Sequence, residues 1–131
     1  SVMLPESEKR LRRVGVLELD GRAMNADEIA RDLSPVFEKY GIQSAVLFGS
    51  FARGRQSARS DLDLILIHNT DKPYFERFDG ILRELYQAIR GRDIDVFIYT
   101  PEELSRISHR RFIQKALEEG KVIYESGQEP V

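Results

Sequence analysis

The sequence predicts an α/β (α+β) fold, in which a small mixed β-sheet is flanked by helices. Three short apolar runs have the length and composition of strands: Ala45–Phe48, Leu62–Ile67 and Ile94–Tyr99. The segments around them carry apolar residues at helical spacing. The 131 residues are the usual size of one domain, so a multi-domain enzyme is not expected.

The N-terminal segment reads differently from the remainder of the chain. Residues 1–13 are polar and charged, Val14–Leu19 has the pattern of a short strand, and an Asp-Gly turn follows. We therefore expect residues 1–24 to be an extension, a tail plus a short strand. The main domain is expected to span residues 25–131.

The first helix of the main domain is predicted by its cap and its apolar spacing. Asn25 and Glu28 form a capping-box pattern, and Gly41 suits the position after the last helical residue. Apolar residues recur between them at helical spacing: Ile29, Leu33, Phe37 and Tyr40. Pro35 interrupts this run, so it either kinks the helix or splits it into two short pieces.

A second helix is predicted between the Leu62–Ile67 and Ile94–Tyr99 strands. Pro73 suits its first position, Gly91 ends it, and an apolar stripe between them is expected to face the core. The stripe consists of Phe75, Phe78, Leu82, Leu85 and Ile89. A helical crossover of this length joins parallel strands, so we expect these two strands to run parallel.

The last elements follow the Ile94–Tyr99 strand. Thr100 and Glu103 form a second capping box, with Pro101 at the first helical position. The helical pattern continues to Gly120, either unbroken or interrupted near residue 108. Val122–Tyr124 is expected to be a final short strand.

Composition limits the chemistry that is available. The 20 Lys and Arg against 22 Asp and Glu give a net charge of −2, so no overall basic field indicates nucleic acid as a direct substrate. The absence of cysteine excludes disulfides and thiol nucleophiles, and two histidines cannot build a His-rich zinc site. No apolar run approaches the ~20 residues that span a bilayer, and no signal-peptide core is visible. We expect a cytoplasmic protein without membrane attachment, whose chemistry uses carboxylates, hydroxyls and basic groups.

Three aspartates are the candidate metal ligands. Asp61 and Asp63 lie two residues apart at the start of a strand, so their side chains point the same way, roughly 7 Å apart. Two carboxylates on one face repel each other unless a cation lies between them, and Mg²⁺ prefers oxygen ligands of this kind. Asp95 is the third candidate; Asp93 is the alternative, but it reads as loop whereas Asp95 lies between apolar strand residues.

Strand directions bring these residues to one rim. Gly49 and Ser50 follow the end of the Ala45–Phe48 strand, whereas Asp61 and Asp63 lie at the start of the next strand. Antiparallel pairing of these two strands places all four residues at one edge of the sheet. Asp95 joins them if its strand runs parallel to Leu62–Ile67.

The Gly-Ser turn has the residue types of a phosphate site. Glycine lets the backbone approach a phosphate closely, and a helix starting after it would aim free N–H groups at the anion. Arg53, Arg55 and Arg59 add positive charge to the same loop. Arg53 either binds phosphate or stays a solvated loop residue. Together with the aspartates, this segment predicts metal-assisted transfer of a phosphorus group.

The segment GSFARGRQSARSDLDLILI, residues 49–67, resembles the signature of the DNA-polymerase-β-like nucleotidyltransferase superfamily. It is most similar to the minimal nucleotidyltransferases, whose pattern runs Gly-Ser-x-Ala-Arg-Gly, a short spacer, then Ser-Asp-x-Asp-Leu. Asp95 matches the third acidic position of that family, and Ala116–Glu125 resembles the way such domains close. The resemblance covers about residues 30–125.

The resemblance implies a nucleotidyltransferase fold for residues 25–131 and a role for each motif residue. Gly49, Ser50 and Arg53 would bind the nucleotide, with ATP as the expected substrate. Asp61 and Asp63 would coordinate two Mg²⁺ ions, with Mn²⁺ as an alternative. Asp95 would help bind one ion and act as base toward the acceptor hydroxyl.

The resemblance also implies a partner. Many minimal nucleotidyltransferases are antitoxins paired with a helical HEPN-type ribonuclease toxin, and some attach AMP to a tyrosine of that toxin. An alternative is a binding module that masks the ribonuclease site with little or no catalysis. A small-molecule transferase similar to aminoglycoside nucleotidyltransferases is a third possibility, but such enzymes usually carry an additional helical domain. The acceptor, the base preference and the oligomeric state, including a homo-oligomer, stay open.

Overall fold

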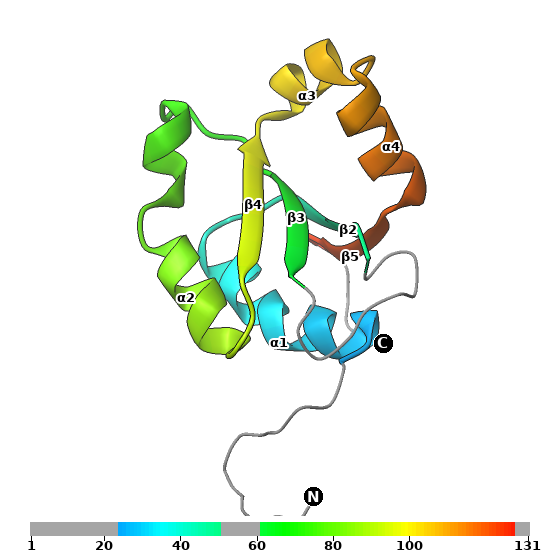
Figure 1. Cartoon of the computed structure of the whole chain (residues 1–131). Helices are drawn as coiled ribbons and strands as arrows, with labels where there is room; N and C mark the ends of the chain where they lie inside the picture. Colours follow the sequence, from blue (N-terminus) through cyan, green and yellow to red (C-terminus); the bar gives the residue numbers. More distant parts are fainter. Residues whose placement is uncertain (1–23, 51–60, 128–131) are drawn as a thin grey trace, which may run out of the picture.

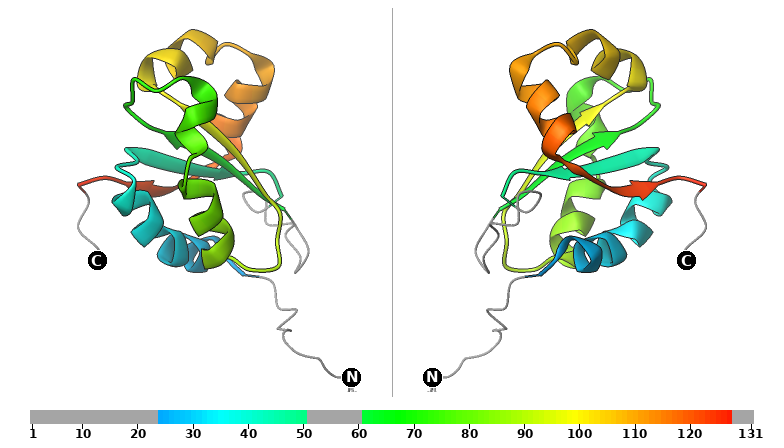
Figure 2. Two further views of the ribbon diagram at one scale, coloured as in Figure 1. Left: turned by 90° about the vertical axis from the view of Figure 1, so that its left-hand side faces the viewer. Right: turned by 90° about the vertical axis from the view of Figure 1, so that its right-hand side faces the viewer.

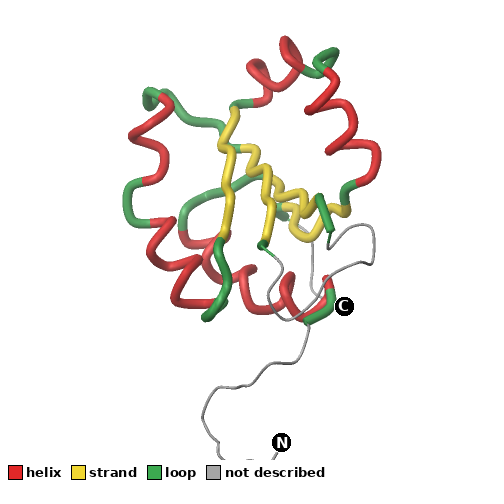
Figure 3. The backbone as a smooth tube through the Cα atoms, viewed as in Figure 1, coloured by secondary structure: helices red, strands yellow, loops and turns green. Residues whose placement is uncertain are grey.

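A four-stranded mixed sheet forms the centre of the computed structural model, which describes residues 24–50 and 61–127 (Figure 1). The strands lie in the order β4-β3-β2-β5. Their bounds are β2 (Ser44–Phe48), β3 (Leu62–Ile67), β4 (Ile94–Tyr99) and β5 (Lys121–Glu125). Figure 3 shows the strands gathered at the centre with helices around them. The predicted fold class is confirmed.

The strand directions agree with the sequence-based prediction. β2 pairs antiparallel with β3, and β3 pairs parallel with β4. β5, which contains the predicted strand at residues 122–124, pairs antiparallel with β2. The strand predicted at residues 14–19 lies outside the described residues, so most of the predicted extension stays a prediction.

Two helices cover one face of the sheet and bury the larger core. Figure 2 shows α1 (Ala26–Lys39) and α2 (Ile81–Ala88) together on that side. Fully buried side chains of α1, α2 and the sheet meet there, among them Ile29, Leu33, Phe37, Leu47, Leu64, Leu66, Leu85 and Ile98. Burying apolar surface on this scale is the main force that holds the helices to the sheet.

Helix α1 forms as its cap predicts. The Asn25 side chain accepts a hydrogen bond from Glu28 N at 2.8 Å, and Glu28 Oε1 accepts one from Asn25 N at 3.0 Å. Pro35 lies inside one continuous helix, so the helix is not split. The Ser34 hydroxyl donates to Ala30 O at 2.6 Å in the turn that proline disturbs.

The opposite face of the sheet carries a smaller core. Helices α3 (Pro101–Ile107) and α4 (Arg111–Glu119) lie on this side (Figure 2). The buried residues of this cluster are Val46, Phe48, Ile65, Ile113 and Ala116. Residues 108–110 form a turn between the two helices, so the interrupted alternative is the one observed.

The predicted single helix over residues 74–90 is wrong. The structure has a 3₁₀ helix, η2 (Tyr74–Phe78), and then α2, separated at Gly80. Gly80 has φ of +81°, which a right-handed helix cannot include, and a Cβ there would lie 2.6 Å from the Tyr40 hydroxyl. Because the helix is broken, Phe75 leaves the predicted core stripe and is 86% exposed.

A partly buried ion pair joins η2 to α3. The Arg77 guanidinium donates to both carboxylate oxygens of Glu103, at 2.6 and 2.9 Å. Glu103 also closes the capping box of α3 with Thr100. The hydrogen bonds from Arg77 and from the Thr100 backbone lower the pKa of Glu103 to about 2. No helix in the described ranges is long and apolar enough to cross a bilayer.

Candidate active site at one rim of the sheet

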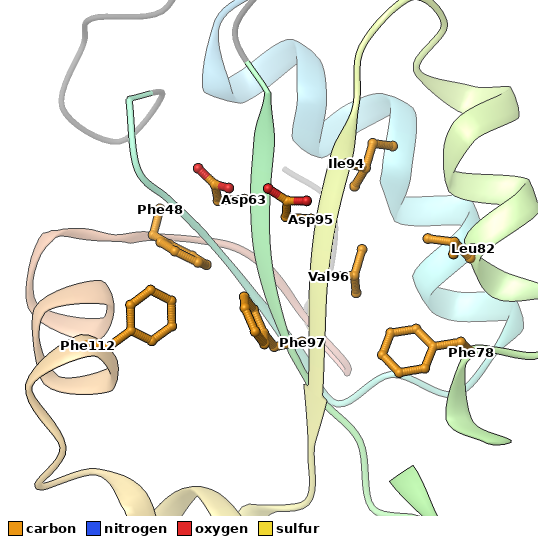
Figure 4. Close-up of a pocket in the computed structure, with 9 residues that line it drawn as sticks. All are labelled: Phe48, Asp63, Phe78, Leu82, Ile94, Asp95, Val96, Phe97 and Phe112. Atoms are coloured by element: carbon orange, nitrogen blue, oxygen red, sulfur yellow. The ribbon is translucent and has the colours of Figure 1, made fainter. Parts of the chain in front are cut away.

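Asp63 and Asp95 are neighbours on adjacent parallel strands. They are Cα partners in the β3–β4 register, so their side chains point to the same face of the sheet. Figure 4 shows the two carboxylates side by side. Asp63 is half-buried and Asp95 is exposed. This face is the one covered in part by α4, and the carboxylates lie at the rim where β3 and β4 begin.

Gly49 holds the chain directly against Asp63. β2 ends at Phe48, whose Cα partner is Asp63, and Gly49 turns away with φ of +79°. A Cβ on Gly49 would collide with Asp63 Oδ2 and lie 3.2 Å from its Cγ. The position therefore needs glycine for its conformation and for the space that the carboxylate occupies.

Of the other predicted site residues, some lie near Gly49 and Asp63 in the chain and the others fall outside the described residues. Ser50 follows Gly49 and is half-buried, and Asp61 is exposed just before β3. Arg53 lies outside the described residues, as do Arg55 and Arg59. Asp93 stays outside β4, where its carbonyl accepts a hydrogen bond from Leu62 N at 2.9 Å.

The donor set fits a hard divalent cation. Carboxylate oxygens are the ligands that Mg²⁺ prefers, and this ion keeps several waters and substrate phosphates in its shell. Asp63 and Asp95 supply two such groups from adjacent strands, with Asp61 two residues before Asp63. Within residues 24–50 and 61–127, no three acidic, histidine or cysteine side chains are already grouped as metal ligands.

Three phenylalanines lie beside the carboxylates. The Phe112 ring, from α4, meets the ring of Phe48 at a centroid distance of 5.7 Å and that of Phe97 at 5.6 Å, both edge-to-face. Phe112 remains 53% exposed. Sequence analysis missed this cluster. The signal that could have found part of it is the alternation of strand residues, which puts Phe97 on the face of Asp95.

A cleft of about 510 Å³ opens along this rim. One wall consists of the two aspartates and the three phenylalanines, and the other consists of apolar residues from β4, η2 and α2 (Figure 4). The residues of the second wall are Ile94, Val96, Phe78 and Leu82. The cleft therefore wraps around strand β4, and its volume is typical of sites for small ligands or single side chains.

A smaller cleft of about 270 Å³ lies between Gly49 and α4. Arg111 and Lys115 line it, and both side chains are exposed. It adjoins the larger cleft at Phe48 and Phe112, which line both. The Gly49 turn thus has Arg111 and Lys115, together with the carboxylate of Glu119, on one side, and Asp63 and Asp95 on the other. The two cations offer positive charge to a polyphosphate.

Known protein families agree with this geometry. The family model described as polymerase beta, nucleotidyltransferase matches residues 31–129, which include every described residue of the site. The chain is a member of this family. The predicted resemblance is confirmed, and the match spans the helices and strands that form the rim.

Two relatives of this nucleotidyltransferase come from Methanocaldococcus jannaschii, and both are named as proposed protein adenylyltransferases. One is 32% identical over 78 residues, which are 58% of this chain and 80% of the relative. The other is 29% identical over 83 residues, which are 63% of this chain and 76% of the relative. The similarity therefore extends over most of each relative.

Solved structures share the fold of this nucleotidyltransferase. A structure from Sulfolobus solfataricus, described as that of a proposed nucleotidyltransferase, has a TM-score of 0.52 at 17% identity and covers 81% of this chain and 85% of that chain. A toxin–antitoxin structure with AMP-PNP has a TM-score of 0.53 at 21% identity, covering 76% and 75%. At these identities the similarity establishes the common fold alone.

Proposed function

We propose that this family member is a metal-dependent nucleotidyltransferase, which transfers a nucleoside monophosphate, AMP from ATP, to an acceptor hydroxyl. The observation that carries the proposal is the register of Asp63 with Asp95, with Gly49 packed directly against Asp63. Two carboxylates and a close-approach glycine at one rim are the parts that phosphoryl and nucleotidyl transfer need.

Each residue has a physical role in this reaction. Gly49 and Ser50 hold the triphosphate, since the backbone at Gly49 carries no side chain toward the site, and Arg53 adds positive charge. Asp95, the exposed carboxylate, accepts the proton of the acceptor hydroxyl. The acceptor oxygen bonds to the α-phosphorus, the bond from that phosphorus to the bridging oxygen breaks, and pyrophosphate leaves.

Asp61, Asp63 and Asp95 are the residues that would hold two Mg²⁺ ions. When bound, the ions supply positive charge that stabilises the attacking and leaving oxygens. The protein's own contribution is to keep the carboxylates of Asp63 and Asp95 on one face and in register before any ligand arrives.

The proposed acceptor is a protein hydroxyl, a tyrosine on a HEPN-type toxin. Two observations support it: relatives are named as proposed protein adenylyltransferases, and a toxin–antitoxin structure with AMP-PNP shares the fold. The partner would then complete the acceptor side of the site.

A second candidate function is masking of a partner without catalysis. Phe112 on α4 and Val122 on β5 are large apolar side chains, 53% and 59% exposed, and they offer contact surface to a partner. In this case the ribonuclease would be neutralised by burial of its site, and the aspartates would be dispensable.

Intact-mass spectrometry of the co-purified partner tests the proposal. We expect ATP and Mg²⁺ to add the mass of one AMP to the partner, and Asp63→Asn with Asp95→Asn to abolish the addition. Asp71→Asn with Asp79→Asn is the matched control, since both residues are exposed and outside the site. An adduct that persists in the Asp63 and Asp95 variant contradicts the proposal, and neutralisation that persists without any adduct supports masking.

A further inference from the structure

Strand β4 forms one edge of the described sheet, and its backbone groups alternate between the sheet and that edge. The carbonyls of Asp93 and Tyr99 accept hydrogen bonds from Leu62 N and His68 N, both at 2.9 Å, so these residues face β3. In a parallel pair, alternate residues direct both backbone groups to the same side. The backbone N–H and C=O groups of residues 94, 96 and 98 therefore point to the outer edge.

Side chains close both ends of this edge. The Tyr86 hydroxyl accepts a hydrogen bond from Ile94 N at 3.1 Å and lies 3.4 Å from Ile94 O, to which it donates. At the other end, the buried Arg77 donates to Ile98 O at 3.0 Å. Capping an edge in this way prevents another strand from pairing along its whole length.

Val96 lies between these two capped residues, and no side chain of the described residues caps its outward backbone groups. Its outward N–H and C=O have no hydrogen-bond partner among residues 24–50 and 61–127. Val96 is half-buried and lines the 510 Å³ cleft, next to Asp95 in the chain. An unpaired donor and acceptor on the same residue, in a partly apolar cleft, favour a ligand that brings one of each.

We propose that an extended segment of the acceptor polypeptide docks in this cleft and pairs with the backbone of Val96. This pairing presents the acceptor hydroxyl of the segment to Asp95. This inference rests on the proposed function, because it assigns the acceptor side of the same site. An extended polypeptide matches the opening because each of its residues offers backbone N–H and C=O groups in the plane of the sheet. The cleft is continuous with the two carboxylates, so the docked segment lies where the acceptor must lie.

The two walls of the cleft define the docked sequence. The residue opposite Val96 has its side chain on the same face as Val96, toward Phe78 and Leu82 (Figure 4). The next residue points to the other face, toward Asp95 and Phe97. The segment should therefore carry an apolar residue directly before or after the residue that bears the acceptor hydroxyl. The phenylalanines on that face favour tyrosine over serine or threonine, since aromatic rings pack well against each other.

The caps also fix the register of the segment. Because Tyr86 occupies both backbone groups of Ile94 and Arg77 occupies the carbonyl of Ile98, a docked chain can pair with both outward groups of one residue only at Val96. A one-residue slip would turn the acceptor hydroxyl to the wrong face. The short pairing gives modest affinity from the backbone, so the remaining affinity must come from the rest of the partner surface.

NMR titration of the ¹⁵N-labelled full chain tests the inference. The probe is the peptide Ac-Lys-Val-Tyr-Val-Lys-NH₂, which places an apolar residue on each side of the tyrosine. A twin peptide carries N-methyl groups on both valines and on the tyrosine, which removes the backbone donors. We expect the probe to shift the Val96 amide signal and to slow its hydrogen exchange, and we expect the twin to bind about tenfold more weakly.

Variants of Val96 give a second measurement. Val96→Pro removes the outward N–H, and proline is tolerated on edge strands, so we expect about a tenfold loss of probe affinity. Val96→Thr keeps the N–H and the β-branched shape and should bind the probe as the natural chain does. The twin peptide needs no variant, so the test stands even if Val96→Pro fails to fold.

The outcomes separate the two proposals. Equal binding of the probe and its twin, or no change at Val96 with millimolar probe, overturns the docking inference. The proposed function is measured separately, by the response of the Gly49 signal to ATP with Mg²⁺ and by AMP transfer to the probe tyrosine. Probe that docks at Val96 while ATP with Mg²⁺ leaves the Gly49 signal unchanged contradicts the proposed function and leaves the docking site in place.

Discussion

Replacing Gly49 by alanine should damage both the stability and the proposed activity of the protein. Gly49 has φ of +79°, and the new methyl group would occupy the place of Asp63 Oδ2. The carboxylate must therefore rotate away from Asp95, or the turn must move. Gly91 provides a matched control, because it has φ of +83° with no neighbouring atom within 4 Å of an added Cβ.

The two substitutions share one cost and differ in another. A left-handed conformation costs an L-residue roughly 1–2 kcal/mol, and both alanines incur it. Gly49→Ala adds the displacement of Asp63, and forcing a side chain from its rotamer costs about 0.5–1.5 kcal/mol. We therefore expect a loss of about 1–2 kcal/mol of unfolding free energy for Gly91→Ala and about 2–3 kcal/mol for Gly49→Ala.

Urea denaturation and nucleotidyl transfer, measured on both variants, test this reasoning. Displacing a reacting group by about 1 Å can reduce the rate about 100-fold, so Gly49→Ala should lose at least that factor, and Gly91→Ala should keep the natural rate. Equal losses of stability in the two variants, with activity retained by Gly49→Ala, would refute the assignment of Gly49 as the close-approach residue of the site.

Three further predictions concern the ion pair, the metal and the first helix. The pKa of Glu103 is depressed to about 2 from its ordinary 4.5, so its contribution is present above about pH 4.5 and is lost as the pH falls toward 2. Glu103→Gln should lower the unfolding free energy by about 2 kcal/mol at neutral pH, allowing for partial exposure of the carboxylate. The unfolding free energy of the variant should also fall less steeply as the pH drops from 4.5 toward 2, which is the acid limb of the stability profile. An unchanged acid limb contradicts the ion pair of Glu103 with Arg77. Mg²⁺ at ten times its Kd should raise the unfolding free energy by about 1.4 kcal/mol, and this increase should vanish in the Asp63→Asn, Asp95→Asn variant; a persistent increase places the ion elsewhere. Pro35→Ala restores a backbone donor inside α1 and should raise the unfolding free energy by about 1–2 kcal/mol, as measured by urea denaturation. This gain is smaller than the full cost of proline in a helix, because alanine also gives the unfolded chain more conformational freedom. A lower unfolding free energy in the variant would show that α1 depends on its proline.

Neighbouring residues supply controls for these variants. Glu102→Gln removes a charge from the first turn of α3 without touching the ion pair, so the acid limb should keep its natural shape. Asp79→Asn should leave the Mg²⁺ response intact, since Asp79 lies outside the site. Ala30→Gly should destabilise α1, the opposite sign to the change expected at Pro35.

The strands and the shared rim of Gly49, Asp63 and Asp95 were accessible from sequence because they depend on local patterns. Each of the strands β2, β3 and β4 is a short apolar run. Strand alternation predicts that Asp61 and Asp63 point to one side, and the structure places Asp61 just before β3. Opposite strand directions then brought Gly49 to the same rim. The pairing of Asp63 with Asp95 follows once the crossover makes β3 and β4 parallel.

Features that depend on tertiary contacts were not accessible. The break at Gly80 lies where the hydroxyl of Tyr40, the residue after α1, approaches the backbone, so the helical spacing of residues 74–90 misled the prediction. Phe112 reaches the site only because α4 packs over Phe48 and Phe97. No pattern within α4 distinguishes that residue from an ordinary surface side chain.

The unequal cores on the two faces of the sheet separate stability from recognition. Most buried side chains lie under α1 and α2, whereas the candidate site and Phe112 lie on the thinner side with α3 and α4. Under the proposed function, substitutions on α4 can therefore change which partner is bound while the larger core of the domain stays intact. A lineage of such proteins could acquire new partners by drift on one face, with little risk to folding, and related copies in one cell could diverge until they no longer recognise each other's targets.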